Sequence, residues 1–217
     1  YDYPNVDALS RYLVLGESVV MPEMAPRSDS YEPVAIVGIG CRFPGSNTPA
    51  EFWKLLIEGR HGITEAPVDR WGHDLQVAAQ NVDPAGEQSL RGGFLKDVDR
   101  FDAGFFGISP READEIDPQQ RLMMEVSWEA FEDAGIPADD LAGSRTGVFV
   151  GVSSSDYQRL ESTIHHPTTG YSATGNSVAV IANRLSYNFD FRGPSWSVDT
   201  ACSSSLVAVH HGCSSLR

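Results

Sequence analysis

The clearest hydrophobic pattern lies in the last part of the sequence. Residues 194–198 form a short apolar segment that begins with proline, which predicts a buried strand. After it, apolar residues recur at spacings of three and four, as on one face of a helix: Leu206, Val209, Cys213 and Leu216. The pattern therefore predicts a strand, a tight turn and a helix, with Cys202 in the turn.

Two other apolar runs, residues 34–37 and 146–152, predict strands that are buried on both faces. Helical patterns cover residues 52–57, which Gly59 ends, and residues 177–187. Between these elements, polar and glycine-rich or proline-rich stretches predict loops at 60–92 and 153–174, and the aromatic residues of 94–106 predict irregular packed structure. Strands that alternate with helices indicate an α/β fold.

A longer helix is predicted over residues 118–134. Asp117 can cap its first turn, Pro118 suits its first position, Gln120 is placed for a capping box, and Gly135 ends it. We expect a buried stripe on this helix, formed by Met123, Val126, Ala130 and Ala134. We expect an acidic, solvated face opposite it, formed by Glu125, Glu129 and Asp133.

The first 32 residues differ from the rest. Residues 1–15 carry an amphipathic helical stripe. Residues 16–32 show little periodicity and carry residues typical of a linker, namely Gly16, Pro22, Pro26, Ser28, Asp29 and Ser30. The sequence therefore predicts three parts: a terminal helix at 1–15, a linker at 16–32 and a folded domain at 33–217.

Composition narrows the choice of partners. The net charge of −14 argues against nucleic acid or an anionic membrane surface as a partner. No apolar run approaches the roughly 18 residues of a membrane span, and the first residues lack a signal-peptide pattern. The three cysteines, an odd number without metal-ligand spacing, indicate a reducing compartment such as the cytoplasm and no disulfide framework.

Cys202 is the candidate nucleophile. A thiol between a strand and a helix lies near the positive end of the helix dipole and near unpaired amides, which favour the thiolate. Ser203 and Ser204 are good helix-starting residues, and small neighbours leave room for a substrate to approach the sulfur. This is the arrangement of a nucleophile elbow, with cysteine in the place of serine. The alternative is a small buried cysteine below a helix cap.

Residues 193–208, GPSWSVDTACSSSLVA, closely resemble the active-site stretch of β-ketoacyl synthases, in particular the ketosynthase domain of a modular type I polyketide synthase. Residues 32–45, EPVAIVGIGCRFPG, resemble the opening of that domain, and residues 109–135 resemble its long N-terminal helix. Residues 1–9, YDYPNVDAL, resemble the last helix of an acyl carrier protein. These resemblances imply a carrier tail at 1–15, a linker at 16–32 and the N-terminal part of a ketosynthase domain at 33–217.

The resemblance implies a thiolase-like layered fold (αβαβα), with the N-terminal half of the core present. It implies a decarboxylative Claisen condensation between an acyl chain held as a thioester on Cys202 and a malonyl-type extender. Partners would be acyl carrier protein domains with phosphopantetheine arms, neighbouring synthase domains and a second copy in a homodimer. The domain itself would need no cofactor and no metal.

The family's two catalytic histidines lie in motifs well beyond the cysteine, and none is expected in this chain. His210 and His211 do not replace them, because eight residues of helix would place His210 about 12 Å from Cys202. The isolated 217-residue piece is therefore expected to be inactive and poorly soluble.

Other interpretations remain. The domain could be a non-elongating ketosynthase that only binds or passes on the acyl chain, an inactive structural fragment, or a cysteine hydrolase for which no base is evident. Gly38 and Gly40 invite a dinucleotide-binding interpretation, but Phe43 stands where the third glycine should be, and Pro44 would interrupt the receiving helix. His165 and His166 lack a third metal ligand at useful spacing.

Overall fold

A computed structural model describes residues 10, 12–14, 33–67, 91–163 and 169–217, the side chains of 161–163 excepted. The chain divides into two compact units, Tyr1–Pro33 and Val34–Arg217. In the first unit, Ser10 and residues 12–14 are helical and exposed. The rest of the predicted terminal helix at 1–15 and the predicted linker at 16–32 lie outside the described residues. All elements below belong to the second unit.

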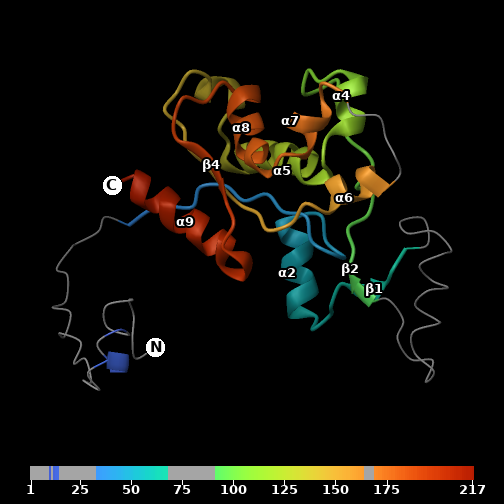
Figure 1. Ribbon diagram of the computed structural model, residues 1–217, viewed down its shortest axis with the longest axis horizontal. Helices are drawn as coiled ribbons and strands as arrows, with labels where there is room; N and C mark the ends of the chain where they lie inside the picture. The colour runs from blue at the N-terminus through green and yellow to red at the C-terminus, as the bar shows by residue number, and fades with distance from the viewer. Residues whose placement is uncertain (1–9, 11, 15–32, 68–90, 164–168) are drawn as a thin grey trace. The chain divides into compact units, whose positions relative to one another are not determined.

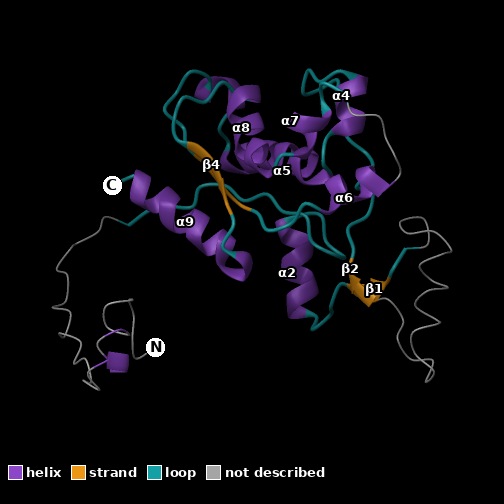
Figure 2. Cartoon of the chain, viewed as in Figure 1, coloured by secondary structure: helices purple, strands orange, loops and turns teal. Residues whose placement is uncertain are grey.

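Helices dominate the second unit, as Figures 1 and 2 show. The helices are α2 (Pro49–Ile57), α4 (Pro110–Glu115), α5 (Pro118–Ala134), α6 (Asp156–Thr163), α7 (Ser172–Asn176), α8 (Val178–Asn188) and α9 (Ser204–Ser215), with 3₁₀ turns η1 (Ala138–Leu141) and η2 (Ala201–Ser203). The strands are β1 (Ile63–Glu65), β2 (Arg91–Gly93), β3 (Val148–Gly151) and β4 (Ser195–Val198). No helix in the described ranges is both long and apolar enough to cross a membrane.

Strands β3 and β4 form a parallel pair in which Val148 lies opposite Ser195 and Gly151 lies opposite Val198. Their side chains alternate between two helices, because successive residues of a strand point to opposite faces. On one face, the Ser197 hydroxyl oxygen accepts a 3.4 Å hydrogen bond from the Ala182 amide of α8. On the other, the Trp196 ring lies 5.2 Å from that of His211 on α9. The pair is thus covered by α8 on one side and α9 on the other, as the predicted α/β fold requires (Figure 1).

The core lies between α5, α8 and the face of this sheet that α8 covers. It is formed by Phe106, Met124, Ala138, Val150, Val152, Ile181, Ala182, Leu185, Phe189 and Phe191. Residues 94–106 are irregular, as predicted; Phe106 belongs to this core and Phe101 packs against it, whereas Phe105 is 55% exposed. The Phe105 ring meets both Phe106 and Trp128 edge to face, at centroid distances of 4.9 and 4.8 Å. The predicted strand at 146–152 and the helices at 52–57, 118–134 and 177–187 are confirmed within a few residues.

The strand predicted at residues 34–37 is wrong. These residues have no assigned secondary structure and are exposed; Ile36 and Val37 keep 82% and 65% of their surface accessible. Among the described residues no other strand pairs with them, and a strand buried on both faces needs such neighbours. The apolar run instead leads into a segment that crosses α5.

The glycines of that crossing segment, Gly38 and Gly40, are needed for packing on α5, and this accounts for the Gly-x-Gly motif without a bound dinucleotide phosphate. A Cβ atom at Gly38 would lie 2.1 Å from the Ala130 carbonyl oxygen, and one at Gly40 would lie 2.2 Å from that of Val126. Both glycines therefore let one backbone pass directly over another. The interpretation as a dinucleotide site is not needed for them.

The acidic residues of α5 are not the purely solvated face that was predicted. The Asp133 carboxylate accepts a 2.9 Å hydrogen bond from the Ile39 amide, and Glu129 forms a bidentate ion pair with Arg42. Burial raises the pKa of the Glu125 carboxyl group, although the nearby Arg42 charge opposes this. Asp133 and Glu129 thus bind the segment 39–42 to helix α5.

Elements missed from the sequence lie mainly in the predicted loops. Helices α6 and α7 occupy part of 153–174, and β1 pairs antiparallel with β2 at the two ends of the predicted loop 60–92. Each of these elements has eight residues or fewer, too few for hydrophobic periodicity to show. His165 and His166, which were considered as metal ligands, lie outside the described residues.

Candidate active site

The turn between β4 and α9 carries Cys202 at the protein surface. The predicted strand, turn and helix are all present: β4 ends at Val198, the 3₁₀ turn η2 spans Ala201–Ser203, and α9 begins at Ser204. Cys202 is exposed, whereas Cys41 is buried and Cys213 is half-buried. Burial raises the pKa of the Cys41 thiol, so the three cysteines have different surroundings.

The predicted helix caps at Ser203 and Ser204 are wrong. The two hydroxyls instead bind backbone groups of the turn. The Ser203 hydroxyl donates to the Thr200 carbonyl oxygen at 2.9 Å. The Ser204 hydroxyl accepts from the Thr200 amide at 2.9 Å and donates to the Ala201 carbonyl oxygen at 2.8 Å. The chain makes a 3₁₀ turn before α9, so these hydroxyls lie beside the turn that precedes the helix. Side-chain hydroxyls readily take such local backbone partners.

The face of α9 that meets the sheet is not the predicted apolar stripe. Leu206, Val209 and Leu216 keep 73%, 62% and 74% of their surface exposed. Ser204 and Ala208 are buried, and each keeps only 6% of its surface exposed. The reason is the short distance between helix and sheet: a Cβ atom at Gly151 would lie 2.6 Å from the Ser204 carbonyl carbon. Small side chains four residues apart permit that approach, and the large apolar ones project outward.

His210 and His211 lie on α9, away from the turn. His210 is exposed, and the His211 ring packs edge-on against Trp196. The third aromatic ring at this contact is Phe149 of β3, whose centroid is 5.6 Å from that of Trp196. His211 therefore has a packing role between the helix and the sheet.

A groove of about 760 Å³ opens beside the turn. Its lining includes Asp199, which lies three residues before Cys202, together with Ser153 and Asp156 after β3 and Ser172 and Asn176 of α7. Most of these groups are polar. The groove lies where the carboxyl ends of the two parallel strands leave the sheet, the usual place for a ligand in α/β proteins.

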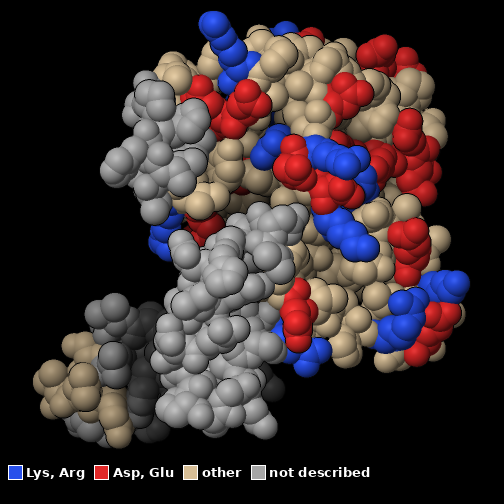
Figure 3. All heavy atoms as spheres, turned by 90° about the vertical axis from the view of Figure 1, so that its right-hand side faces the viewer, with Lys and Arg blue, Asp and Glu red and all other residues tan. Residues whose placement is uncertain are grey.

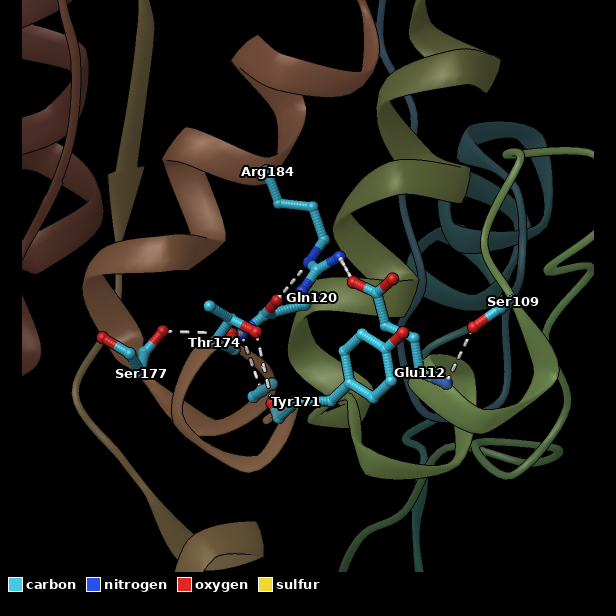
Figure 4. A network of polar contacts seen from close by, with 8 residues as sticks. Ser109, Glu112, Gln120, Tyr171, Thr174, Ser177 and Arg184 are labelled. Carbon is cyan, nitrogen blue, oxygen red and sulfur yellow. Dashed lines mark hydrogen bonds and ion pairs between the residues drawn. The ribbon is translucent and has the colours of Figure 1, made fainter. Parts of the chain in front are cut away.

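A buried polar network holds one wall of this groove, the segment 172–177 (Figure 4). Gln120 of α5, 1% exposed, donates through Nε2 to the carbonyl oxygens of Thr174 and Gly175 at 3.0 and 2.7 Å. Its Oε1 atom accepts from Arg184 Nε at 2.6 Å, and Arg184 in turn binds Glu112 at 2.7 Å. One side chain thereby links helix α5 to both α7 and α8.

This role of Gln120 was not predicted, because it was interpreted as part of a capping box. Asp117 does cap α5, by accepting from the Gln119 amide at 2.8 Å. The available sequence signal was Arg184, the one charged residue in the mostly apolar stretch 178–185, which implies a buried polar partner. The sequence did not indicate which residue supplies it.

Charge on the face shown in Figure 3 is of both signs. Acidic side chains are spread over it, and basic ones lie among them. One pocket, of about 530 Å³, shows this mixture, with Arg42, Lys96 and Arg100 beside Asp97, Asp102 and Glu125. No single-sign patch is built there, although the whole chain carries a net charge of −14.

Comparison with known proteins gives a consistent family. The family model described as "Beta-ketoacyl synthase, N-terminal domain" matches residues 31–217. A phenolphthiocerol/phthiocerol polyketide synthase protein of Mycobacterium tuberculosis is 46% identical over 229 aligned residues, which cover 100% of this chain and 12% of that protein. A second protein of the same synthase, from the same species, is 50% identical over 187 residues, covering 86% of this chain and 12% of that protein.

Solved structures agree. An oxazolomycin ketosynthase domain from Streptomyces albus superimposes with a TM-score of 0.72 at 41% identity, over 84% of this chain and 31% of that one. The ketosynthase from module 6 of the Bacillus subtilis bacillaene synthase gives a TM-score of 0.68 at 36% identity, over 84% and 29%. The chain thus spans about a third of these ketosynthase structures and has the N-terminal part of their thiolase-like fold. The family match, the relatives and the shared fold together show that the chain belongs to the β-ketoacyl synthases, with residues 31–217 forming the N-terminal domain of a ketosynthase of the polyketide synthase type.

Proposed function

We propose that this chain supplies the acyl-accepting nucleophile of a ketosynthase that extends polyketide chains, and that Cys202 is this nucleophile. The observation that carries the proposal is the exposed thiol of Cys202 on the turn between β4 and α9, within the segment that matches the family. Cys41 is buried and Cys213 half-buried, so Cys202 is the most accessible of the three thiols.

In the first step, the Cys202 sulfur attacks the carbonyl carbon of an acyl thioester on the phosphopantetheine arm of an acyl carrier protein. The new carbon–sulfur bond forms as the old one breaks, and the thiol proton of Cys202 ends on the released phosphopantetheine thiol. Exchange of one thioester for another needs no external energy source, and a nucleophile of this kind divides the condensation into two easier steps.

In the second step, a malonyl-type thioester on a carrier loses carbon dioxide. The electron pair of the broken carbon–carbon bond forms a new bond to the acyl carbonyl carbon, and the Cys202 thiolate leaves and takes up a proton. Groups for the decarboxylation, including the two histidines that the family uses, are not assigned to this chain. We therefore propose that the 217-residue chain alone is inactive in condensation, as expected, and that it keeps only the first step, the transfer of an acyl group to Cys202.

The remaining partners follow from the same proposal. The carrier tail at 1–15 and the linker at 16–32 are proposed from the resemblance of residues 1–9 to an acyl carrier protein, and they would place a carrier directly before the ketosynthase. The similarity to the first mycobacterial synthase also covers residues 1–32. We also propose a homodimer, neighbouring synthase domains in the same polypeptide and a cytoplasmic location, as the resemblance implies. The phosphopantetheine arm would enter as part of the substrate, and no resident cofactor or metal is proposed.

The test is the intact mass of the chain after brief exposure to a short acyl thioester. We expect one acyl adduct, which peptide mapping places on Cys202, and none in a Cys202→Ala variant. Cys213→Ala is the matched control and should keep the adduct. An adduct that persists in Cys202→Ala, or that maps to Cys41 or Cys213, would contradict the proposal.

A further inference from the structure

The turn that carries Cys202 has a backbone conformation that needs support. Ala201 has a φ angle of +54°, in the left-handed region. This region is unfavourable for residues with a side chain, and it persists where surrounding contacts determine it. Ala201 directly precedes Cys202, so its φ and ψ angles set the direction in which the thiol leaves the turn.

Ser204 supplies the first of these contacts. Its side chain is buried, at 6% exposure. The hydroxyl accepts from the Thr200 amide at 2.9 Å and donates to the Ala201 carbonyl oxygen at 2.8 Å. A single hydroxyl therefore joins the peptide group that precedes Thr200 to the peptide group that follows Ala201, and so spans both residues. The neighbouring Ser205 is exposed and offers a matched control.

Asp199 supplies the second contact. Its Oδ1 atom accepts a 2.9 Å hydrogen bond from the Ala201 amide, a pattern in which an aspartate fixes the backbone two residues on. The bond is charge-assisted, and the donor belongs to the strained residue itself.

The sheet below limits how far the turn can move. Gly151 pairs with Val198, the last residue of β4, and a Cβ atom at Gly151 would lie 2.6 Å from both the Ser204 carbonyl carbon and the Ser205 nitrogen. The start of α9 is thus in direct contact with the end of β3. With the helix fixed there, the Ser204 hydroxyl has a defined position from which to hold Ala201.

From these contacts, we infer that Ser204 and Asp199 are positioning residues for Cys202, which hold Ala201 in the left-handed conformation that directs the thiol toward an acyl thioester. The inference rests on the proposed function, because it assumes that Cys202 accepts the acyl group. It assigns neither residue to contact with the substrate. Positioning of this kind affects reactions that need a defined geometry more than reactions that need only an exposed thiol.

The test compares two reactions of Cys202 in the 217-residue chain. Acylation by an N-acetylcysteamine thioester needs the thiol and the oxyanion donors to be aligned, whereas alkylation by iodoacetamide needs an accessible thiol. We expect Ser204→Ala and Asp199→Ala each to lower the ratio of acylation rate to alkylation rate about tenfold. Ser205→Ala should leave the ratio unchanged, and Asp199→Asn, which retains an acceptor oxygen, should restore most of it. Circular dichroism and the alkylation rate of Cys213 on α9 report whether the helix remains folded.

A double-mutant cycle with Ala201→Gly tests the mechanism, because glycine adopts a positive φ angle without strain. In that background the effect of Ser204→Ala should fall below threefold, and this arm decides the question if Ser204→Ala alone fails to fold. A wild-type chain that is acylated, with ratios unchanged in Ser204→Ala and Asp199→Ala, would overturn the inference and leave the proposed function standing. A wild-type Cys202 that is alkylated but never acylated would overturn the proposed function, and the inference with it.

Discussion

Single residues in this chain have effects that depend on the backbone they touch. Glu125, Glu129 and Asp133 share one face of α5, yet Asp133 and Glu129 bind the segment 39–42 and Glu125 bears a cost of burial. Likewise, Ser203 and Ser204 have hydroxyls on the turn at Thr200, whereas the next serine is exposed. Similar side chains next to one another therefore predict different responses to substitution.

We expect Glu125→Gln to raise the free energy of unfolding at pH 7. Burial raises the pKa of this carboxyl in the folded state, so the folded chain binds the proton more tightly than the unfolded chain does. The resulting cost is absent below the carboxyl's ordinary pKa, and it is fully present above its raised pKa. The gain should therefore appear at pH 7 and vanish near pH 4, as measured by urea unfolding followed by tryptophan fluorescence.

Glu129→Gln is the matched variant, with the opposite expectation. It removes the bidentate partner of Arg42, whose side chain is 22% exposed, and should lower the free energy of unfolding by about 1 kcal/mol at pH 7. Equal effects of the two substitutions at pH 7 would contradict this account of the acidic face.

Elements in this fold are held together by close backbone contacts and by buried amides. The segment 38–40 crosses α5 through two glycines, α9 meets β3 at Gly151, and α5 binds the 174–177 segment through Gln120. Each contact joins elements that are far apart in the sequence. A substitution that adds or removes a few atoms at such a contact should therefore weaken the packing of one element on the other.

We expect Gly38→Ala to lower the free energy of unfolding by about 1–3 kcal/mol, because the added Cβ would lie 2.1 Å from the Ala130 carbonyl oxygen. Gly170→Ala is the control, since a Cβ there meets nothing within 4 Å. Urea denaturation of both variants provides the comparison. Equal stability of the two would show that residues 38–40 do not pack on α5 in solution.

Gln120→Met should loosen the 172–177 wall of the groove. The substitution keeps the volume but leaves Arg184 Nε and two carbonyl oxygens without their buried partner, a cost of about 2–4 kcal/mol. Hydrogen exchange should accelerate in α7 and the start of α8, while β3 keeps its protection. Gln158→Ala, at an exposed residue of α6, should change neither region. Unchanged exchange in α7 would show that the wall does not depend on Gln120.

At the scale of the whole molecule, one feature dominates: an apolar surface on α9, formed by Leu206, Val209 and Leu216. It is accompanied by further exposed apolar residues in the second unit, among them Ile36, Val37, Trp196 and Tyr187. Exposed apolar surface of this extent favours association.

We expect the 217-residue chain to self-associate as its concentration rises. Replacing Leu206 and Val209 together by lysine should shift sedimentation toward the monomer without loss of helical circular dichroism. Leu160→Lys, on α6, is the control and should leave association unchanged, although Leu160 is also exposed. A wild-type chain that stays monomeric at high concentration would refute the expectation.

The sequence predicted most of the elements around the site, because long periodic segments and the strand–turn–helix at 194–216 have strong local signals. It failed where the outcome depends on neighbours. Residues 34–37 have the composition of a buried strand, but among the described residues they pair with no strand. The apolar periodicity of 206–216 correctly predicted helix α9. The stripe was wrongly predicted to face the sheet, because the sheet contact is made by the small residues Ser204 and Ala208.

The same limit applies to the site. Cys202 was predicted to be the nucleophile from its neighbours in the sequence; the structure places it, exposed, on the predicted turn, and its catalytic role stays a prediction. The partners of Ser204 and Gln120 could not be predicted, since both side chains were interpreted as helix caps, and local patterns do not contain the contact that displaces them.

The small-residue face of α9 also has a geometric consequence. The helix touches the end of β3 at Ser204, where almost no space remains, while its apolar face from Leu206 to Leu216 is about 15 Å long and open to solvent. Because the two faces lie on opposite sides of the helix, a protein surface that packs on Leu206 and Val209 can cover them without entering the contact between Ser204 and Gly151. Burial of this apolar face is therefore compatible with an unchanged turn at Cys202.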